Sequence, residues 1–253
     1  MPPPPLAFRE ELREKRFSSV WTTELDAVFA DVAPYYDKAN QVASLGLWNW
    51  FRDGFLDTIG LERGYRVLDV CAGTNAIGIG LLEREPSLQV HAIDRSEAMQ
   101  RVGQQRAREH GFHIESVLGD VHRLPFPDNH FDIVTLQFAS RHLKVRTAFS
   151  EIYRVLKPGG RFHHCDMLRP SNPVVENVYY TYLKFCLTFT ALVFNSGPAA
   201  LNCRKYFIDA LQMFYSPEEL STLLRELGYK QVRVSTVFAG MLAFHKASKA
   251  AAG

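Results

Sequence analysis

The 253-residue chain has an ordinary globular composition, with 47% hydrophobic and 22% charged residues, which excludes a chain that is disordered throughout. The formal net charge is only +2, and no block of basic residues could follow a phosphate backbone, so nucleic acid is not expected as a partner. The length suits one large α/β domain and leaves little room for a second.

The two ends of the chain differ from the middle. Residues 1–27 open on the proline run Pro2 to Pro5, continue with charged residues and contain no apolar stretch that could be a signal peptide. We predict a flexible leader over 1–27, a single domain over 28–247 and a tail over 248–253. The four cysteines form no C-x-x-C pair, so neither a disulfide framework nor a metal site is predicted, and the cytoplasm is the expected compartment.

Between the two ends, short β-branched runs alternate with amphipathic stretches, which is typical of parallel βαβ units. Strands are predicted over 65–70, 88–93, 113–118, 131–138, 161–167, 230–239 and 241–247. The principal helices are predicted over 76–85, 145–155 and from Pro217, with Ser216 and Glu219 forming a capping box. Gly240, between the last two strands, predicts a tight antiparallel return. The fold class is therefore α/β and Rossmann-like, with a mostly parallel seven-stranded sheet, an antiparallel last strand and helices on both faces.

Three acids stand at the ends of the first three strands, at the edge where parallel sheets bind ligands. Near Asp69 the chain must turn sharply, and Gly73 lets a ligand approach the backbone closely. Asp94 is placed to accept hydrogen bonds from ribose hydroxyls, and Asp120 from the amine of adenine. Each acid alone is also compatible with a helix cap or a loop, but the three together favour a nucleoside site.

The turn after Asp69 argues against a nicotinamide cofactor because it lacks the G-x-G-x-x-G spacing that a pyrophosphate needs. An acid at the strand end instead favours the positively charged sulfonium and amino groups of S-adenosylmethionine.

From Val28 to Lys246 the chain resembles the UbiE family of ubiquinone and menaquinone C-methyltransferases. Residues 28–40 (VFADVAPYYDKAN) are similar to the family's V-F-x-x-V-A-x-x-Y-D-x-x-N block. The stretches 124–129 (LPFPDN) and 153–160 (YRVLKPGG) match as well. Further matches are Tyr206, Asp209 and Met213, and in the last two strands Ala239, Gly240, Ala243 and His245.

The resemblance implies a class I methyltransferase fold, with cover helices over 28–60 and a helical lid inserted over 174–215. It implies S-adenosyl-L-methionine as the cofactor, with Tyr36 and Asn40 closing over it. The residues expected to bind it are Asp69, Cys71, Gly73, Asn75, Asp94, Arg95, Asp120, Val121 and Gln137.

The chain also departs from the family pattern. Ala72 and Asn75 stand at two glycine positions of the turn; asparagine tolerates a left-handed backbone best among non-glycine residues, so we expect the turn to survive. Trp48 and Phe51 replace a tryptophan and histidine pattern, and Asp166 replaces a glutamate. The altered turn leaves open the transfer of a group other than methyl, and leaves the role of Cys71 undecided.

Arg141 and His142 are the predicted catalytic pair, because they follow the fourth strand, where a phenolic acceptor would need help losing a proton. Arg141 could stabilise a phenolate, and His142, at a family asparagine position, has an ordinary pKa suited to a general base. The alternative, that both only stabilise a helix entry, stays open. His163 and His164 are interpreted as strand residues that face opposite sides, so only Asp166 is considered for the site.

The expected function is C-methylation of a lipophilic quinol or phenol, such as a demethylated ubiquinone or menaquinone precursor, because the lid is rich in aromatic residues. For most of these aromatic residues core packing of helices on the sheet is the favoured explanation, although a lid and a core can share them. N-methylation of a phospholipid or other amine, and a non-catalytic role as a cofactor-binding assembly partner, remain alternatives. Peripheral contact with the inner face of the membrane, a homodimer and a quinone-biosynthesis complex are left open. The apolar tract 178–194 is too short to cross a bilayer.

Overall fold

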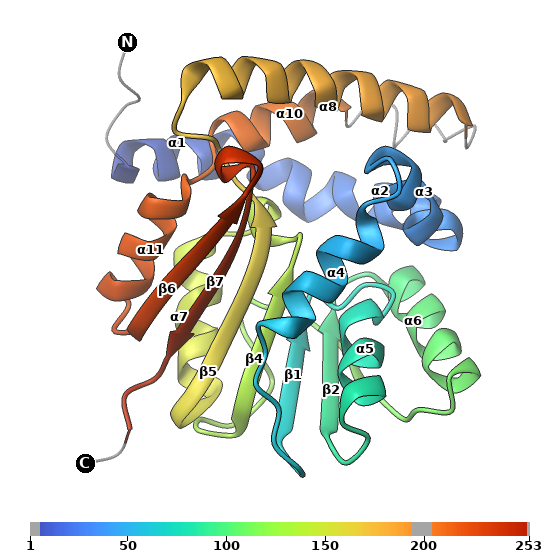
Figure 1. Cartoon of the computed structure of the whole chain (residues 1–253), viewed down its shortest axis with the longest axis vertical. Coiled ribbons are helices and arrows are strands. Elements are labelled where there is room, and N and C mark those ends of the chain that lie inside the picture. The colour runs from blue at the N-terminus through green and yellow to red at the C-terminus, as the bar shows by residue number, and fades with distance from the viewer. Residues whose placement is uncertain (1–5, 194–203, 252–253) are drawn as a thin grey trace.

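A mixed β-sheet forms the centre of the computed structural model, which describes residues 6–193 and 204–251 (Figure 1). Seven strands in the described residues follow the spatial order β3-β2-β1-β4-β5-β7-β6. They are β1 (Arg66–Val70), β2 (Gln89–Asp94), β3 (Glu115–Leu118), β4 (Phe131–Gln137), β5 (Leu156–Met167), β6 (Lys230–Val237) and β7 (Leu242–Ser248). Strands β1 to β5 pair in parallel, and β7 is antiparallel to both β5 and β6. The predicted sheet is confirmed, including its antiparallel return.

Three strand boundaries differ from the prediction by two residues or more, and the end of β6 is one of them, at Val237 rather than at residue 239. Strand β3 begins at Glu115 rather than at residue 113. Strand β5 begins at Leu156 rather than at Arg161, because Leu156 already pairs with Phe131 before a bulge shifts the register. The glycines that were expected to separate helix from strand therefore lie inside the strand, at this irregularity.

Helices cover both faces of the sheet, as predicted. On one face α4 (Trp48–Asp57), α5 (Ala76–Arg84) and α6 (Glu97–Glu109) contribute to a core that includes Phe55, Leu81 and Ile133. On the other, α7 (Val145–Val155) and α11 (Pro217–Glu226) pack around Phe149 and Leu223. The predicted capping box of α11 is present: Ser216 accepts from the amide of Glu219, and the Glu219 side chain accepts from the amide of Ser216.

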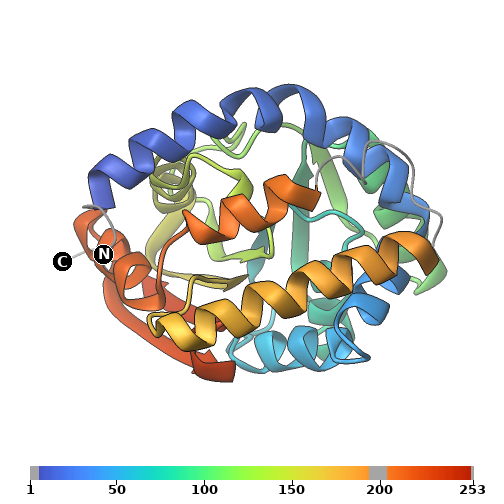
Figure 2. The same ribbon diagram turned by 90° about the horizontal axis from the view of Figure 1, so that it is seen from above.

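A third group of helices lies above the carboxyl ends of the parallel strands (Figures 1 and 2). It consists of α2 (Leu25–Val32), α3 (Tyr36–Ala43), α8 (Pro173–Val193) and α10 (Arg204–Gln212). Seen from above, α8 crosses one side of this edge, the N-terminal helices follow the opposite rim, and α10 lies between them (Figure 2). Helices α8 and α10 correspond to the expected lid; its residues 194–203 lie outside the described part of the chain.

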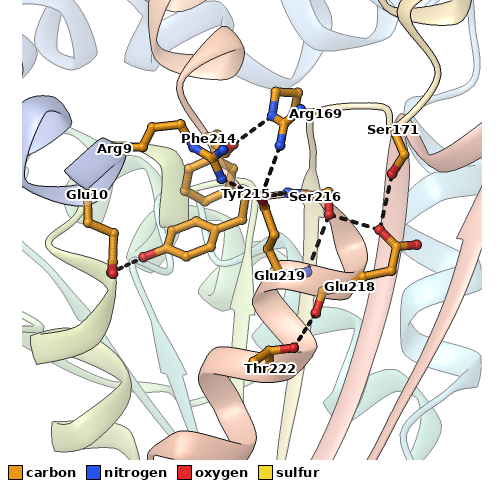
Figure 3. A network of polar contacts seen from close by, with 10 residues as sticks. All are labelled: Arg9, Glu10, Arg169, Ser171, Phe214, Tyr215, Ser216, Glu218, Glu219 and Thr222. Atoms are coloured by element: carbon orange, nitrogen blue, oxygen red, sulfur yellow. Dashed lines mark hydrogen bonds and ion pairs between the residues drawn. The ribbon is translucent and has the colours of Figure 1, made fainter. Parts of the chain in front are cut away.

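The leader is not flexible over most of its length. Residues 6–19 form helix α1 (Leu6–Ser19), and Arg13 and Phe17 are buried. The helix is held against the start of α11: Arg9 pairs with Glu219, and the hydroxyl of Tyr215 donates to Glu10 (Figure 3). The prediction failed because the partners that order this charged segment come from the far end of the chain. The N-terminal cover therefore begins at residue 6, not 28.

Candidate active site

The turn after β1 adopts a backbone that few residue types accept. Cys71, Gly73 and Asn75 all have positive φ, at 54°, 52° and 57°. Asn75 is in the left-handed region directly before α5, so asparagine does sustain this turn in place of glycine. Gly103, on α6, allows the turn to lie close, because a Cβ there would stand 2.9 Å from the carbonyl oxygen of Gly73.

Asp94, the last residue of β2, organises the same turn. Its two carboxylate oxygens accept from the amides of Gly73 and Ser96, each at 2.8 Å. Ser96 in turn caps α6 by accepting from the amide of Met99. Burial raises the pKa of Asp94, and the amide donors of Ser96 and Gly73 oppose that rise. Because a carboxylate offers about four acceptor sites, the oxygens keep capacity for ribose hydroxyls.

Asp69, in β1, has one carboxylate oxygen without a partner. Oδ1 accepts from Thr135 Oγ1 at 2.6 Å, whereas Oδ2 is buried and makes no hydrogen bond of normal geometry within the described ranges. Burial raises the pKa of Asp69 to about 7, and the Thr135 hydroxyl and the backbone amide of Gly78 oppose that rise. A buried, unsatisfied acceptor is costly unless a ligand supplies the missing donor, so this oxygen fits a positively charged ligand group.

The N-terminal cover is fastened to the turn through Asp37, a residue that the sequence reasoning missed. Thr74 Oγ1 lies 3.1 Å from both carboxylate oxygens of Asp37, and Arg106 on α6 pairs with the same carboxylate. Arg106 also donates to the carbonyl of Thr74 at 3.0 Å. The signal was present, because Asp37 lies between Tyr36 and Asn40 in the block that had been singled out.

The remaining predicted cofactor residues differ in their exposure and in their hydrogen-bond partners. Asp120 is exposed and held by the amide and ring of His122, while Val121 beside it is buried. Gln137, at the end of β4, has a buried Nε2 that lacks a partner in the described structure. The side chain of Arg95 is turned to the N-terminal helices, where it pairs with Asp26 at 2.8 Å. Its guanidinium therefore binds the N-terminal helices and does not face the turn after β1.

A cavity of about 420 Å³ lies between the sheet edge and the helices above it. Its walls are mostly apolar and come from α2, α3, α4, α8, α10, the segment after β4, the end of β5 and the turn between β6 and β7. Trp48 and Phe138 stack in the wall with ring centroids 4.8 Å apart, and Phe51 lines it too. Tyr36, Asn40 and Arg141 are the predicted site residues that reach it.

Arg141 is fixed at this cavity by Asp166. Its Nη1 lies 2.7 Å from Oδ1 of Asp166 and 2.8 Å from the carbonyl of Phe138. Nε is buried and has no partner among the residues described. Asp166 is itself satisfied by the amide and hydroxyl of Ser140 and by the amide of Met167. The guanidinium is thus oriented by a rigid carboxylate and keeps a donor for a ligand.

His142 does not reach the cavity lining, so its predicted role as a general base is not supported by its position. Trp21 Nε1 donates to the hydroxyl of Tyr206, which lies 2.6 Å from Nδ1 of His142. The hydrogen bond between the Tyr206 hydroxyl and Nδ1 occupies this nitrogen whichever of the two groups donates. Burial, with Arg141 and Arg13 nearby, holds the pKa of His142 well below its usual range. The sequence could not show this, because Trp21 and Tyr206 are distant in the chain.

Tyr179, on α8, is a second residue that sequence reasoning did not single out for the site. It is 4% exposed, lines the cavity, and its hydroxyl is buried without a partner in the part of the chain described. Burial raises its pKa well above the usual range, with Arg141 acting in the opposite direction. It had been counted only among the aromatic residues of the lid.

The family model described as the ubiE/COQ5 methyltransferase family matches residues 17–249. The chain belongs to this family. It is 31% identical over 225 residues to a demethylmenaquinone methyltransferase of Anoxybacillus flavithermus, covering 88% of this chain and 94% of that relative. A demethylmenaquinone methyltransferase of Renibacterium salmoninarum is 33% identical over 227 residues, with 89% and 92% covered.

Solved methyltransferase structures share the fold of this ubiE/COQ5 family member. A possible histamine N-methyltransferase of Thermotoga maritima superposes with a TM-score of 0.63 at 18% identity, covering 88% of this chain and 98% of that one. An S-adenosylmethionine-dependent methyltransferase of Aquifex aeolicus gives 0.56 at 21% identity, with 78% and 88% covered. The chain is thus a class I methyltransferase whose methyl donor is S-adenosylmethionine. The unpartnered oxygen of Asp69 and the left-handed turn fit that donor.

Proposed function

We propose that this methyltransferase transfers a methyl group to a ring carbon of a lipophilic quinol, a demethylated precursor of menaquinone or ubiquinone. The observation that carries the proposal is the position of Arg141, a single oriented cation at the base of an aromatic and aliphatic cavity. Flat rings with an apolar tail suit such walls, and the guanidinium suits one ring oxygen. The names of the related enzymes from Anoxybacillus and Renibacterium support the same substrate class.

Different residues would bind the methyl donor and the methyl acceptor. Asp69 and Asp94 would hold S-adenosylmethionine beside the turn, Asp120 and Val121 its adenine, and Tyr36 and Asn40 would close over it. When bound, the cofactor supplies an activated methyl group. Arg141 lowers the free energy of the phenolate relative to the phenol, whose ordinary pKa is about 10. The phenolate form would make the ring carbon nucleophilic toward the methyl group that the bound cofactor supplies, and the phenolic and ring protons would pass to solvent.

An amine acceptor is disfavoured by the charge of this cavity. No acid stands among the described residues that line it, and the nearby carboxylate of Asp166 is already held by Arg141 and Ser140. N-methylation of a phospholipid head group would need the opposite arrangement, with a carboxylate facing the amine or an aromatic cage free of cations.

The assay supplies the purified chain with S-adenosylmethionine and a short-tailed demethylmenaquinol kept reduced, and identifies products by mass spectrometry and NMR. We expect a carbon-bound methyl group on the quinol and none on phosphoethanolamine or phosphatidylethanolamine. Arg141→Gln should lower kcat on the quinol by 10- to 100-fold, because one oriented charge is lost. Methylation of either amine with no methylation of the quinol would overturn the proposal.

We further propose that α8 lies on the membrane surface from which this acceptor comes. None of the described helices combines the length and apolar character that a membrane crossing requires. The outer face of α8 nevertheless exposes Val174, Val178, Phe185, Phe189 and Val193, at 71%, 66%, 64%, 46% and 53%. The opposite side of the same helix, with Leu183 and Leu187, lines the cavity. One helix would thus contact lipid on one side and the acceptor on the other.

Sedimentation with vesicles of mixed neutral and anionic lipids tests this surface. The parent chain should bind, and Phe185→Glu with Phe189→Glu should release it while S-adenosylmethionine binding stays unchanged. The double variant should also raise KM for a long-tailed quinol more than for a short-tailed one. Failure of the parent to sediment, or a stable dimer in light scattering that the double variant dissolves, would contradict a lipid contact.

A further inference from the structure

Helix α1 carries two buried guanidinium groups that have different partners. Arg9 and Arg13 are one helical turn apart, and they are 4% and 1% exposed. Arg9 pairs with Glu219, which also contacts Arg169, so it fastens α1 to the start of α11 (Figure 3). Arg13 is directed elsewhere, toward the turn that carries Arg141.

The contacts of Arg13 are to backbone carbonyls and ring faces. Its Nη1 donates to the carbonyl of Arg141 at 3.2 Å and its Nη2 to the carbonyl of Leu143 at 2.8 Å. The guanidinium carbon lies 5.0 Å and 5.2 Å from the ring centroids of Trp21 and Phe214. Burial lowers the pKa of Arg13, so keeping its guanidinium charged at this position costs folding free energy. The planar guanidinium of arginine can donate hydrogen bonds to two carbonyls held at a fixed separation, which the ammonium group of lysine cannot do.

The turn η3 (Ser140–His142) is therefore held from two sides. Asp166 accepts from the Ser140 amide and pairs with the Arg141 side chain, whereas Arg13 donates to the carbonyls of Arg141 and Leu143. Any rotation of the turn that moved the Arg141 side chain within the cavity would have to break one of these two sets of bonds. Arg13 and Asp166 thus act together on the same short segment, residues 140–143.

We propose that Arg13 is a positioning residue for methyl transfer: it fixes the turn of residues 140–143 so that Arg141 meets the acceptor in one orientation. The inference rests on the proposed role of Arg141, and it assigns part of the catalytic geometry to the N-terminal helix. A displacement of about 1 Å in a catalytic group can cost a hundredfold in rate, so an indirect contact of this kind suffices.

The simplest competing explanation is that Arg13 only attaches α1 to the domain. Arg9 gives a matched control, because it is on the same face of the same helix, equally buried, and contacts Glu219 instead of the turn. Loss of attachment should affect Arg9 and Arg13 variants alike, whereas loss of positioning should affect Arg13 variants only.

The experiment compares Arg13→Lys, Arg13→Gln, Arg9→Gln, Arg141→Gln and the double variant Arg13→Gln/Arg141→Gln in the full chain. Steady-state kinetics use S-adenosylmethionine and a short-tailed demethylmenaquinol, with thermal melting as the measure of folding. We expect Arg13→Gln to lower kcat 10- to 100-fold with KM for S-adenosylmethionine within about threefold. Arg13→Lys should fall between it and the parent and keeps the test possible should Arg13→Gln not fold. Arg9→Gln should lower the melting temperature and leave kcat within about threefold.

The double variant separates the two proposals. If Arg13 acts through Arg141, Arg13→Gln should lower kcat no further once Arg141 is already replaced. Equal kcat values for Arg13→Gln and Arg9→Gln would overturn the positioning role while leaving Arg141 intact as the catalytic residue. A parent-like kcat for Arg141→Gln would instead refute the role of Arg141, and the positioning role with it.

Discussion

Nη1 of Arg141 and Oδ1 of Asp166 lie 2.7 Å apart, and the Asp166 side chain is fully buried. Removal of the charge by Asp166→Asn leaves a buried guanidinium without its counter-ion, which costs about 3–5 kcal/mol in the free energy of unfolding. We also expect kcat to fall at least tenfold, because the orientation of Arg141 is lost. Urea unfolding and steady-state kinetics measure the two effects.

The control for this prediction is a pair at the surface. Asp128 pairs with Arg154 at 2.7 Å but its side chain is 67% exposed. Asp128→Asn should change the free energy of unfolding by less than about 1 kcal/mol and leave kcat unchanged. A parent-like kcat in Asp166→Asn would show that this ion pair only stabilises the fold.

Binding of S-adenosylmethionine should strengthen as pH rises through neutrality, because burial raises the pKa of Asp69 to about 7. A cationic ligand needs the carboxylate, so affinity should increase roughly eightfold between about pH 6 and 7.5, below the pKa of an α-amino group. Calorimetry across this range measures the change. In Asp69→Asn the affinity should be lower and almost independent of pH, and an unaltered pH dependence would assign it to another group.

The raised pKa of Asp69 also makes the stability of the fold depend on pH, in the direction opposite to that of ligand binding. A carboxyl group whose folded-state pKa lies above its unfolded value binds more protons in the native state, so its stabilising contribution is complete below the unfolded value of 3.8. This stabilising contribution is lost as pH rises through about 7, and binding of the cationic ligand restores part of the lost stability.

Local patterns in the sequence account for the sheet and for the acids at its edge. Strand β2 ends at Asp94, and β1 ends at Val70, one residue after Asp69; both ends were predictable because alternation and turn residues are local signals that span a few positions. Helix α1 was missed for the opposite reason. Arg9 and Arg13 look like solvated charges until Glu219 and the carbonyls of residues 141 and 143 are placed against them. Sequence separation, not weak propensity, hid this part of the site.

The environment of His142 was hidden in the same way. Its residue type and its place after the fourth strand suggested a base with an ordinary pKa, but burial beside Trp21, Tyr206 and two arginines is a property of the assembled fold. Burial and like charges decide a histidine's pKa, and neither is visible in a linear pattern.

His142→Asn should therefore leave kcat within about threefold of the parent and should not shift the acidic limb of the pH profile. The loss of the Tyr206 bond should lower the free energy of unfolding by about 1 kcal/mol. Kinetics from pH 5.5 to 9 with thermal melting distinguish the two effects. A fall in kcat as large as that of Arg141→Gln would restore His142 as a catalytic residue.

Gly103→Ala should weaken S-adenosylmethionine binding at least tenfold without unfolding the chain. The added Cβ would stand 2.9 Å from Gly73 O and 3.0 Å from Asn75 Cγ, so α6 or the turn must move. Gly54→Ala is the matched control, because Gly54 also lies within a helix and its Cβ would meet only Phe244, at 3.9 Å. Calorimetry measures the affinity of both variants for S-adenosylmethionine. Equal affinities would show that the turn can move without weakening binding.

Tyr179→Phe should impair catalysis and leave the fold as stable as before, or more stable. The substitution removes only a hydroxyl that is buried at the cavity without a partner in the described structure. Loss of one hydrogen bond to the acceptor should lower kcat/KM for the quinol about three- to tenfold, whereas removal of an unsatisfied polar atom raises the free energy of unfolding. Tyr180→Phe, one residue along the same helix and outside the cavity lining, should leave kcat/KM unchanged. If both variants keep full activity, the Tyr179 hydroxyl does not bind the acceptor. A fall in kcat/KM together with a loss of stability would instead indicate that the hydroxyl has a structural partner in the folded protein.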